Sequence, residues 1–79
     1  MKRLELYTRA ECHLCHEAQA VIEHVRREID CELEVTDIDS DPDLVERYGL
    51  HIPVLLIDGE FFARYRVDEA QLREYMSRA

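Results

Sequence analysis

The chain has 79 residues, a length that supports one small domain with one hydrophobic core. Its formal net charge of −8 at pH 7 would repel a phosphate backbone, so we expect no sequence-independent binding to DNA or RNA. No apolar run approaches the roughly 20 residues that cross a bilayer, and no apolar stretch typical of a secretory signal follows the basic pair Lys2-Arg3. We therefore expect a single domain over residues 1–79, without membrane association and located in the cytoplasm.

The first half of the chain has the periodicities of a strand, a helix and a second strand. Residues 3–8 alternate apolar and polar side chains, which predicts a strand. Between Leu14 and Ile29 the apolar residues recur at intervals of three and four, which predicts an amphipathic helix. A second strand is indicated over residues 33–38, closed by Ile38.

The second half predicts a short helix followed by a β-hairpin. Asp41-Pro42-Asp43 is typical of a helix start, and Gly49 suits a left-handed helix end. The apolar run Val54–Ile57 predicts a strand covered on both faces. Asp58-Gly59 then predicts a tight turn into a fourth strand near residues 60–64.

A capping box introduces the last helix. Asp68 and Gln71 have the spacing for it, and Val67 can pack against Leu72. The order of elements is then β-α-β-α-β-β-α. A strand, a crossover helix and a strand give a right-handed parallel unit, whereas the hairpin gives an antiparallel pair. The predicted fold class is α/β, a mixed four-stranded sheet with helices packed on its faces.

The cysteine content points to redox chemistry or a metal site rather than to a secreted disulfide scaffold. The three cysteines, Cys12, Cys15 and Cys31, make an odd number without a visible secretion signal. Cys31 has no partner nearby in the sequence. We expect it to behave as a small, buried or half-buried apolar side chain.

The strongest motif is Cys12-His13-Leu14-Cys15, where the first strand gives way to the first helix. Two cysteines three positions apart at a helix start can bring their sulfurs within bonding distance. Cys12 at the helix cap would meet unpaired N–H groups and the helix dipole, which lower the pKa of a thiol from its usual value of about 8.5. Cys15, one turn inside, would be less exposed and could attack a mixed disulfide at Cys12. These are the roles of a nucleophile and a resolving thiol.

Three other interpretations of the same residues have to be weighed. Cys12–His16 matches the C-x-x-C-H pattern of haem attachment, although the mixed α/β pattern argues against a haem pocket. Two buried structural thiols are a second alternative. A zinc site, the third, would add to the pair two ligands from Cys31, His16, His24 and His51. No second C-x-x-C accompanies the pair, so we predict no metal and no bound cofactor.

A proline precedes the predicted third strand in His51-Ile52-Pro53. Such a proline can simply begin the strand, and trans is the default for an X–Pro bond. A cis bond would instead make a sharp bend and aim the Ile52 backbone outward. Periodicity does not decide between the two.

The run from Leu4 to His16 resembles the opening of glutaredoxins, within the thioredoxin-fold superfamily. Those proteins have a strand ending in Tyr-Ser or Tyr-Thr, then a basic residue, then C-x-x-C opening a helix. His51-Ile52-Pro53-Val54 stands where the family has Thr-Val-Pro, and the order of elements matches over essentially all 79 residues. The likeness is to small bacterial glutaredoxin-like proteins in particular.

The resemblance implies a thiol–disulfide oxidoreductase that reduces protein or low-molecular-weight disulfides. It implies that Cys12 attacks the substrate disulfide and that Cys15 resolves the mixed disulfide. The partners would be a disulfide-containing protein or glutathione, with glutathione as a co-substrate, and a thiol reductant. The acidic surface and the short length favour a monomer.

The resemblance also implies which residues contact the substrate. Pro53 would be cis, and Ile52 would offer its backbone to a bound peptide or to glutathione, as in β-strand addition. Arg9 takes the position of the basic residue that helps to hold the glutathione carboxylate. Asp68 lies near the acidic residue that meets the glutamyl end.

Two departures from the family pattern affect the substrate site. The usual Pro-Tyr between the cysteines is His13 and Leu14 here, which would line the site without a rigid turn or an aromatic wall. The usual Gly-Gly before the last helix is Ala63-Arg64-Tyr65-Arg66, about one residue longer. Bulky side chains there could block the tripeptide, although Arg64 or Arg66 could recruit a carboxylate. An alternative function is therefore a thioredoxin-fold binding module that docks a partner or holds a metal without turnover.

Overall fold

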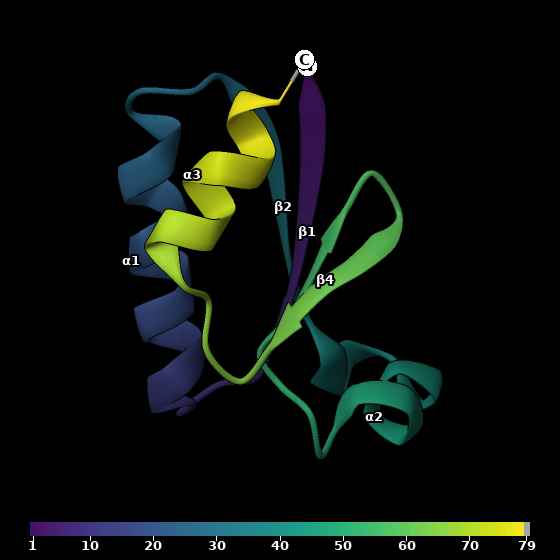
Figure 1. Cartoon of the computed structure of the whole chain (residues 1–79). Coiled ribbons are helices and arrows are strands. Elements are labelled where there is room, and N and C mark those ends of the chain that lie inside the picture. The colour runs from purple at the N-terminus through teal and green to yellow at the C-terminus, as the bar shows by residue number, and fades with distance from the viewer. Residues whose placement is uncertain (79) are drawn as a thin grey trace.

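The computed structural model describes residues 1–78, and its elements follow the predicted order (Figure 1). The strands are β1 (Lys2–Thr8), β2 (Cys31–Asp37), β3 (Val54–Ile57) and β4 (Glu60–Arg64). The helices are α1 (His13–Arg26), α2 (Pro42–Tyr48) and α3 (Glu69–Ser77), with a short 3-10 turn, η1 (Ile38–Ser40), before α2. No helix in the described part of the chain is long and apolar enough to cross a membrane.

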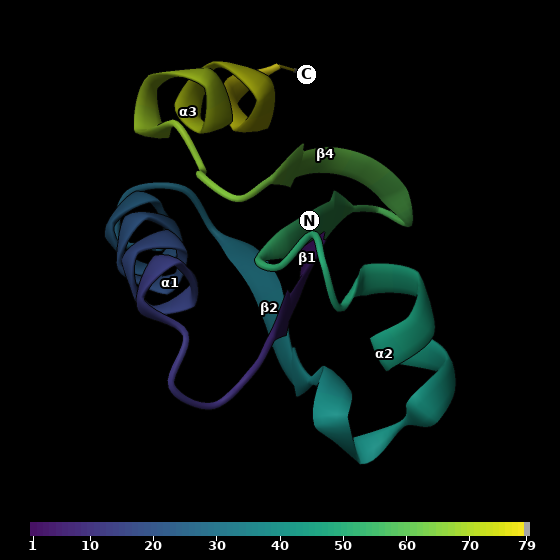
Figure 2. The same cartoon turned by 90° about the horizontal axis from the view of Figure 1, so that it is seen from below.

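The four strands form one mixed sheet in the order β2-β1-β3-β4. β1 pairs with β2 in parallel and with β3 antiparallel, and β3 pairs antiparallel with β4. Helices α1 and α3 lie side by side on one face, and α2 lies beyond the other face near one end of the sheet (Figures 1 and 2). The predicted α/β fold class is confirmed.

The core lies between the sheet and the helices α1 and α3. Leu4 and Leu6 of β1 and Leu55 and Ile57 of β3 are buried in one apolar cluster with side chains of both helices. The helices contribute Ala18, Ile22, Val25, Leu72 and Met76 to this cluster. The apolar intervals in the sequence therefore identified the core face of each helix.

Cys31 belongs to the same core cluster. It begins β2 beside Lys2, the first residue of β1, and so lies at the opposite end of the sheet from Thr8 and the loop that leads to Cys12. Burial raises the pKa of the Cys31 thiol, and the nearby Arg26 partly opposes this effect. Cys31 is thus the buried apolar side chain that the sequence predicted.

The two predicted helix caps and the predicted hairpin turn are also confirmed. The Asp41 carboxylate accepts a hydrogen bond from the Asp43 N–H at 2.9 Å at the start of α2. The Asp68 carboxylate accepts from the Gln71 N–H at 3.0 Å at the start of α3. Asp58-Gly59 makes the hairpin turn with φ values of 51° and 83°, the positive pair that a tight hairpin needs.

The predicted left-handed end of α2 at Gly49 is wrong, because Gly49 has a right-handed φ of −54°. Glycine is needed at this position because a backbone carbonyl oxygen lies close to where a Cβ would stand. A Cβ at Gly49 would lie 2.5 Å from the carbonyl oxygen of Val45, which is too near for any side chain.

Two predicted boundaries shift by a few residues. Helix α1 ends at Arg26, and residues 27–29 form a tighter closing turn in which the Glu28 and Ile29 N–H groups both donate to the Val25 carbonyl oxygen at 3.0 Å. Ile38 does not close the second strand but begins η1, where it is buried. In each case an apolar residue just outside the element, the partly buried Ile29 or the buried Ile38, continued the periodicity of that element.

The core position of Leu55 yields a stability prediction. This side chain in the central strand β3 has an exposed fraction of 0%. Leu55→Ala should lower the free energy of unfolding by about 2–5 kcal/mol, because it removes buried methyl groups and leaves a cavity. Phe61→Ala on β4, where the side chain is 62% exposed, is the control and should change stability by about 0.5 kcal/mol or less. Urea denaturation measures both, and equal effects would contradict this view of the core.

The cap of α3 yields a second prediction. Asp68→Ala should cost about 1 kcal/mol of stability, because the Gln71 N–H loses its acceptor. Asp68→Asn keeps an acceptor oxygen and should cost much less. Thermal unfolding of the two variants beside the original chain provides the measurement, and an equal loss in both would show that charge rather than capping matters.

Candidate active site

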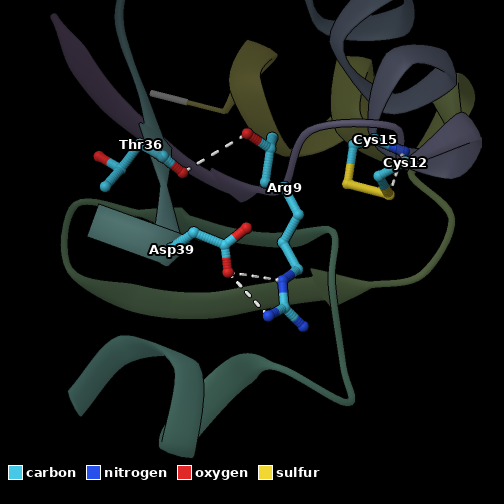
Figure 3. Close-up of a disulfide and its surroundings, with 6 residues drawn as sticks. Arg9, Cys12, Cys15, Thr36 and Asp39 are labelled. Atoms are coloured by element: carbon cyan, nitrogen blue, oxygen red, sulfur yellow. Dashed lines mark hydrogen bonds and ion pairs between the residues drawn. A yellow bond between two sulfur atoms is a disulfide. The ribbon is translucent and has the colours of Figure 1, made fainter. Parts of the chain in front are cut away.

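Cys12 and Cys15 meet where the loop after β1 enters α1. Cys12 is the N-cap residue of α1, and its Sγ accepts a hydrogen bond from the Cys15 N–H at 3.2 Å. The two Cα atoms are 5.2 Å apart, and the sulfurs are joined in a disulfide (Figure 3). Cys15 is 1% exposed, whereas Cys12 is only half-buried. The predicted cap position of Cys12 and the deeper position of Cys15 are therefore confirmed.

The loop before the cysteines turns sharply through Glu11. Glu11 has a φ of 57°, in the left-handed region that residues with a long side chain rarely adopt. It allows the chain to pass from the end of β1 at Thr8 to the start of α1 at His13 within four residues. Sequence reasoning missed this turn because no glycine, asparagine or proline marks it.

Arg9 lies on this loop but is already paired. Its Nη2 and Nε lie 2.7 and 3.0 Å from the same carboxylate oxygen of Asp39 in η1, and this hydrogen bonding raises the pKa of Arg9. Figure 3 shows the side chain extending toward Asp39 rather than toward the disulfide. A substrate carboxylate at Arg9 would have to compete with Asp39, a partner that the sequence did not reveal.

The bond between Ile52 and Pro53 is cis, as the resemblance implied. In this loop the His51 N–H donates to the Tyr48 carbonyl oxygen at 2.8 Å, and the Pro53 carbonyl oxygen accepts from the Tyr65 N–H at 2.8 Å. The N–H and C=O of Ile52 take part in no hydrogen bond within residues 1–78. One backbone donor and one acceptor are thus free for an incoming chain.

Strand pairing brings three loops to the same end of the sheet. Val54, the first residue of β3, pairs with Tyr7 near the end of β1 and with Arg64 at the end of β4. The loops that carry Cys12, Ile52 and residues 65–68 therefore leave the sheet together. The structure thus gathers at one end the residues of the motif, the proline loop and the segment before α3.

A cavity of about 350 Å³ lies between α1 and the segment before α3. Its apolar lining includes Leu14 and Val67, and Asp68 also lines it. At its edge the Arg66 Nη1 lies 3.8 Å from a carboxylate oxygen of Glu17, and the Arg66 side chain is 78% exposed. Leu14 and Asp68, both predicted as substrate-binding residues, share this cavity.

His13 and the potential zinc ligands were also singled out from the sequence. His13 is exposed, with its Nε2 3.7 Å from a carboxylate oxygen of Glu17. No group of three or more potential metal ligands occurs within residues 1–78, and Cys31 lies in the core at the other end of the sheet. The ligand set of the zinc interpretation is therefore not assembled around the cysteine pair.

Tyr65 is a further residue of this end that sequence reasoning did not single out. Its φ is 66°, in the left-handed region where bulky residues are rare. Its Oη lies 3.3 Å from both the Leu50 carbonyl oxygen and the His51 Nδ1. No local sequence signal predicts a tyrosine in this conformation.

Solved structures share the fold across nearly the whole chain. A protein from Nitrosomonas europaea has a TM-score of 0.82 at 31% identity, covering 96% of this chain and 92% of that one. A protein from X. campestris has a TM-score of 0.77 at 32% identity, covering 91% and 92%. A mutant thioredoxin from Halobacterium salinarum has a TM-score of 0.70 at 24% identity, covering 95% and 71%, and shows likeness of fold alone.

Sequence comparison identifies relatives and a family. An uncharacterized protein of Mycobacterium tuberculosis is 29% identical over 82 residues, which cover 98% of this chain and 84% of that protein. The family described as Glutaredoxin-like domain (DUF836) matches residues 3–77, which include both cysteines, the cis proline and the cap of α3. The chain therefore belongs to this family of glutaredoxin-like domains.

Proposed function

We propose that this chain is a dithiol–disulfide oxidoreductase that reduces disulfides in proteins or in small molecules. One observation carries the proposal: a half-buried Cys12 caps α1 within disulfide reach of a buried Cys15. Membership of a glutaredoxin-like family supports a redox protein in general. Our proposal adds to this family assignment a specific reaction, a class of substrate and a role for each residue.

The first step is attack by the Cys12 thiolate on one sulfur of the substrate disulfide. The substrate S–S bond breaks, its other sulfur leaves as a thiolate that takes up a proton, and a mixed disulfide forms on Cys12. The N–H groups at the start of α1, including that of Cys15, favour the thiolate of Cys12 over the thiol. The partial exposure of Cys12 lets a substrate sulfur approach.

The second step transfers the bond to Cys15. Its thiolate attacks the Cys12 sulfur, the mixed disulfide breaks, and the second substrate sulfur leaves as a thiol after protonation. The product is the Cys12–Cys15 disulfide, and two electrons have passed to the substrate. An external thiol reductant, for which glutathione is one candidate, returns them. We place the reaction in the reducing cytoplasm and expect a monomer.

The substrate site is proposed at the end of the sheet where the three loops meet. An extended substrate chain would pair with the free N–H and C=O of Ile52, as in strand addition. Leu14 and the cavity beside it would receive an apolar group next to the reacting sulfur. Arg66, exposed and at 3.8 Å from Glu17, is freer to meet a substrate carboxylate than Arg9, which is tightly paired. His13 and Asp68 complete the proposed contacts.

Replacing each of the two cysteines should block the proposed reaction at a different step. Cys12→Ser should abolish reduction of a disulfide-bonded peptide, because no sulfur remains to attack it. Cys15→Ser should accumulate a mixed disulfide on Cys12, visible by mass spectrometry, because nothing resolves it. Cys31→Ala is the matched control and should keep the activity. A binding module without turnover would bind the peptide in all variants and reduce it in none, and that result would reject the proposal.

The cap position of Cys12 predicts its reactivity with pH. In the reduced Cys31→Ala variant, the rate of Cys12 alkylation should rise through a midpoint below about 8.5, the value for a free thiol, because the helix start stabilises the thiolate. The rate is low below the midpoint, where the thiol is protonated, and constant above it. A midpoint at that of a free thiol, together with absent reductase activity, would count against the assignment.

A further inference from the structure

Tyr65 anchors both ends of the segment Leu50–Pro53. Its backbone N–H donates to the Pro53 carbonyl oxygen at 2.8 Å, and its Oη donates to the Leu50 carbonyl oxygen at 3.3 Å. One residue after β4 therefore spans the proline loop from one end to the other. We call this arrangement the Tyr65 clamp.

His51 is part of the same hydrogen-bond chain. The phenol has a single O–H proton, which the Leu50 carbonyl oxygen can accept, and the Oη also lies 3.3 Å from the His51 Nδ1. Both hydrogen bonds are made together when His51 carries its proton on Nδ1 and donates it to the Oη. These hydrogen bonds run from His51 through Tyr65 to Leu50. They hold the His51 side chain in addition to the two ends of the loop.

The backbone of Tyr65 is held in a costly conformation. A tyrosine with a φ of 66° persists only where its surroundings determine it, and such residues concentrate at binding sites. Here the surroundings are three hydrogen bonds to the loop and the Arg64 guanidinium, which lies over the ring at 5.3 Å from its centre. The Arg66 N–H also donates to the Arg64 carbonyl oxygen at 2.8 Å and closes a tight turn around Tyr65. The clamp therefore uses a conformation that packing alone would not favour.

The clamp holds a backbone that has unused hydrogen-bonding capacity. Between its two anchors, the N–H and C=O of Ile52 have no partner within residues 1–78. Adding a strand to such an edge costs less when the edge is already ordered, because less conformational freedom is lost on binding. A disulfide carried by a polypeptide gains from this order, whereas a small disulfide without a backbone does not.

We propose that Tyr65 is a positioning residue that holds Ile52 ready for an extended polypeptide substrate and so favours protein disulfides over small ones. This inference rests on the proposed function and adds to it the class of substrate. Tyr65 touches neither sulfur, and it acts through the loop that it holds.

The test compares two substrates in three variants. Tyr65→Phe removes both hydrogen bonds of the Oη and should raise KM for a disulfide-bonded peptide by at least about fivefold, the effect of losing one such bond, with kcat unchanged. KM for bis(2-hydroxyethyl) disulfide should stay the same. Tyr65→Gly, which accepts the positive φ freely, should raise KM for the peptide at least as much without loss of thermal stability. Tyr75→Phe, whose ring packs edge-on against Phe62 on the α3 side, is the matched control and should change neither KM.

The outcomes separate the clamp from the redox assignment. An unchanged KM for the peptide in Tyr65→Phe, or an equal rise for both substrates, would overturn the positioning role. Failure of the original chain to reduce either substrate would instead overturn the proposed function. Amide hydrogen exchange gives a readout without catalysis: the His51 N–H, bonded to the Tyr48 carbonyl oxygen, should exchange faster in Tyr65→Phe than in Tyr75→Phe. Equal exchange rates would reject the clamp.

Discussion

The pairing of β3 with both of its neighbours decides where the chemistry of this chain can lie. Val54 pairs with Tyr7 on one side and with Arg64 on the other, so three loops distant in the sequence leave the sheet at one end. A slip of one residue would move the side chains of β3 to the wrong face and separate these loops. The burial of Leu55 and Ile57 raises the free energy of the slipped pairing. The core therefore also holds the three loops of the candidate site together.

The two cysteines of the pair differ in their exposure to solvent. Cys12 is partly exposed at the helix cap, while Cys15 is buried and bonded to Cys12. In the proposed reaction, this difference directs external attack to the Cys12 sulfur and reserves the Cys15 sulfur for internal exchange. The same proposal leaves out Cys31, which lies at the other end of the sheet and whose pKa is raised by burial.

The features that were predictable from sequence are those with a local cause. The caps at Asp41 and Asp68 and the turn at Asp58-Gly59 depend on neighbours within three residues, so their residue types identified them. The order of elements and the placement of Cys12 and Cys15 followed from periodicity and spacing. The resemblance, rather than periodicity, supplied the cis bond before Pro53.

The features that escaped prediction depend on contacts between distant segments. Asp39 neutralises Arg9 from 30 residues away, and Tyr65 reaches Leu50 from 15 residues away. Neither pairing has a pattern in the sequence, because each arises only after the sheet has formed. The reason for Gly49 is local but was also missed: the carbonyl oxygen of Val45, one turn earlier, occupies the space that a side chain would need, and no residue-type rule marks this contact.

Helix α2 buries none of its residues, and a stack of Tyr48 on Tyr7, with ring centres 4.7 Å apart, is one of its few ties to the sheet. Segments with so little buried apolar surface open at a low free energy, long before the whole domain unfolds. The loop that follows α2 would therefore inherit the fluctuations of its upstream neighbour if it were fastened on that side alone. Its hydrogen bonds to Tyr65, the residue that follows β4, fasten the loop on its other side and limit how far those movements reach it.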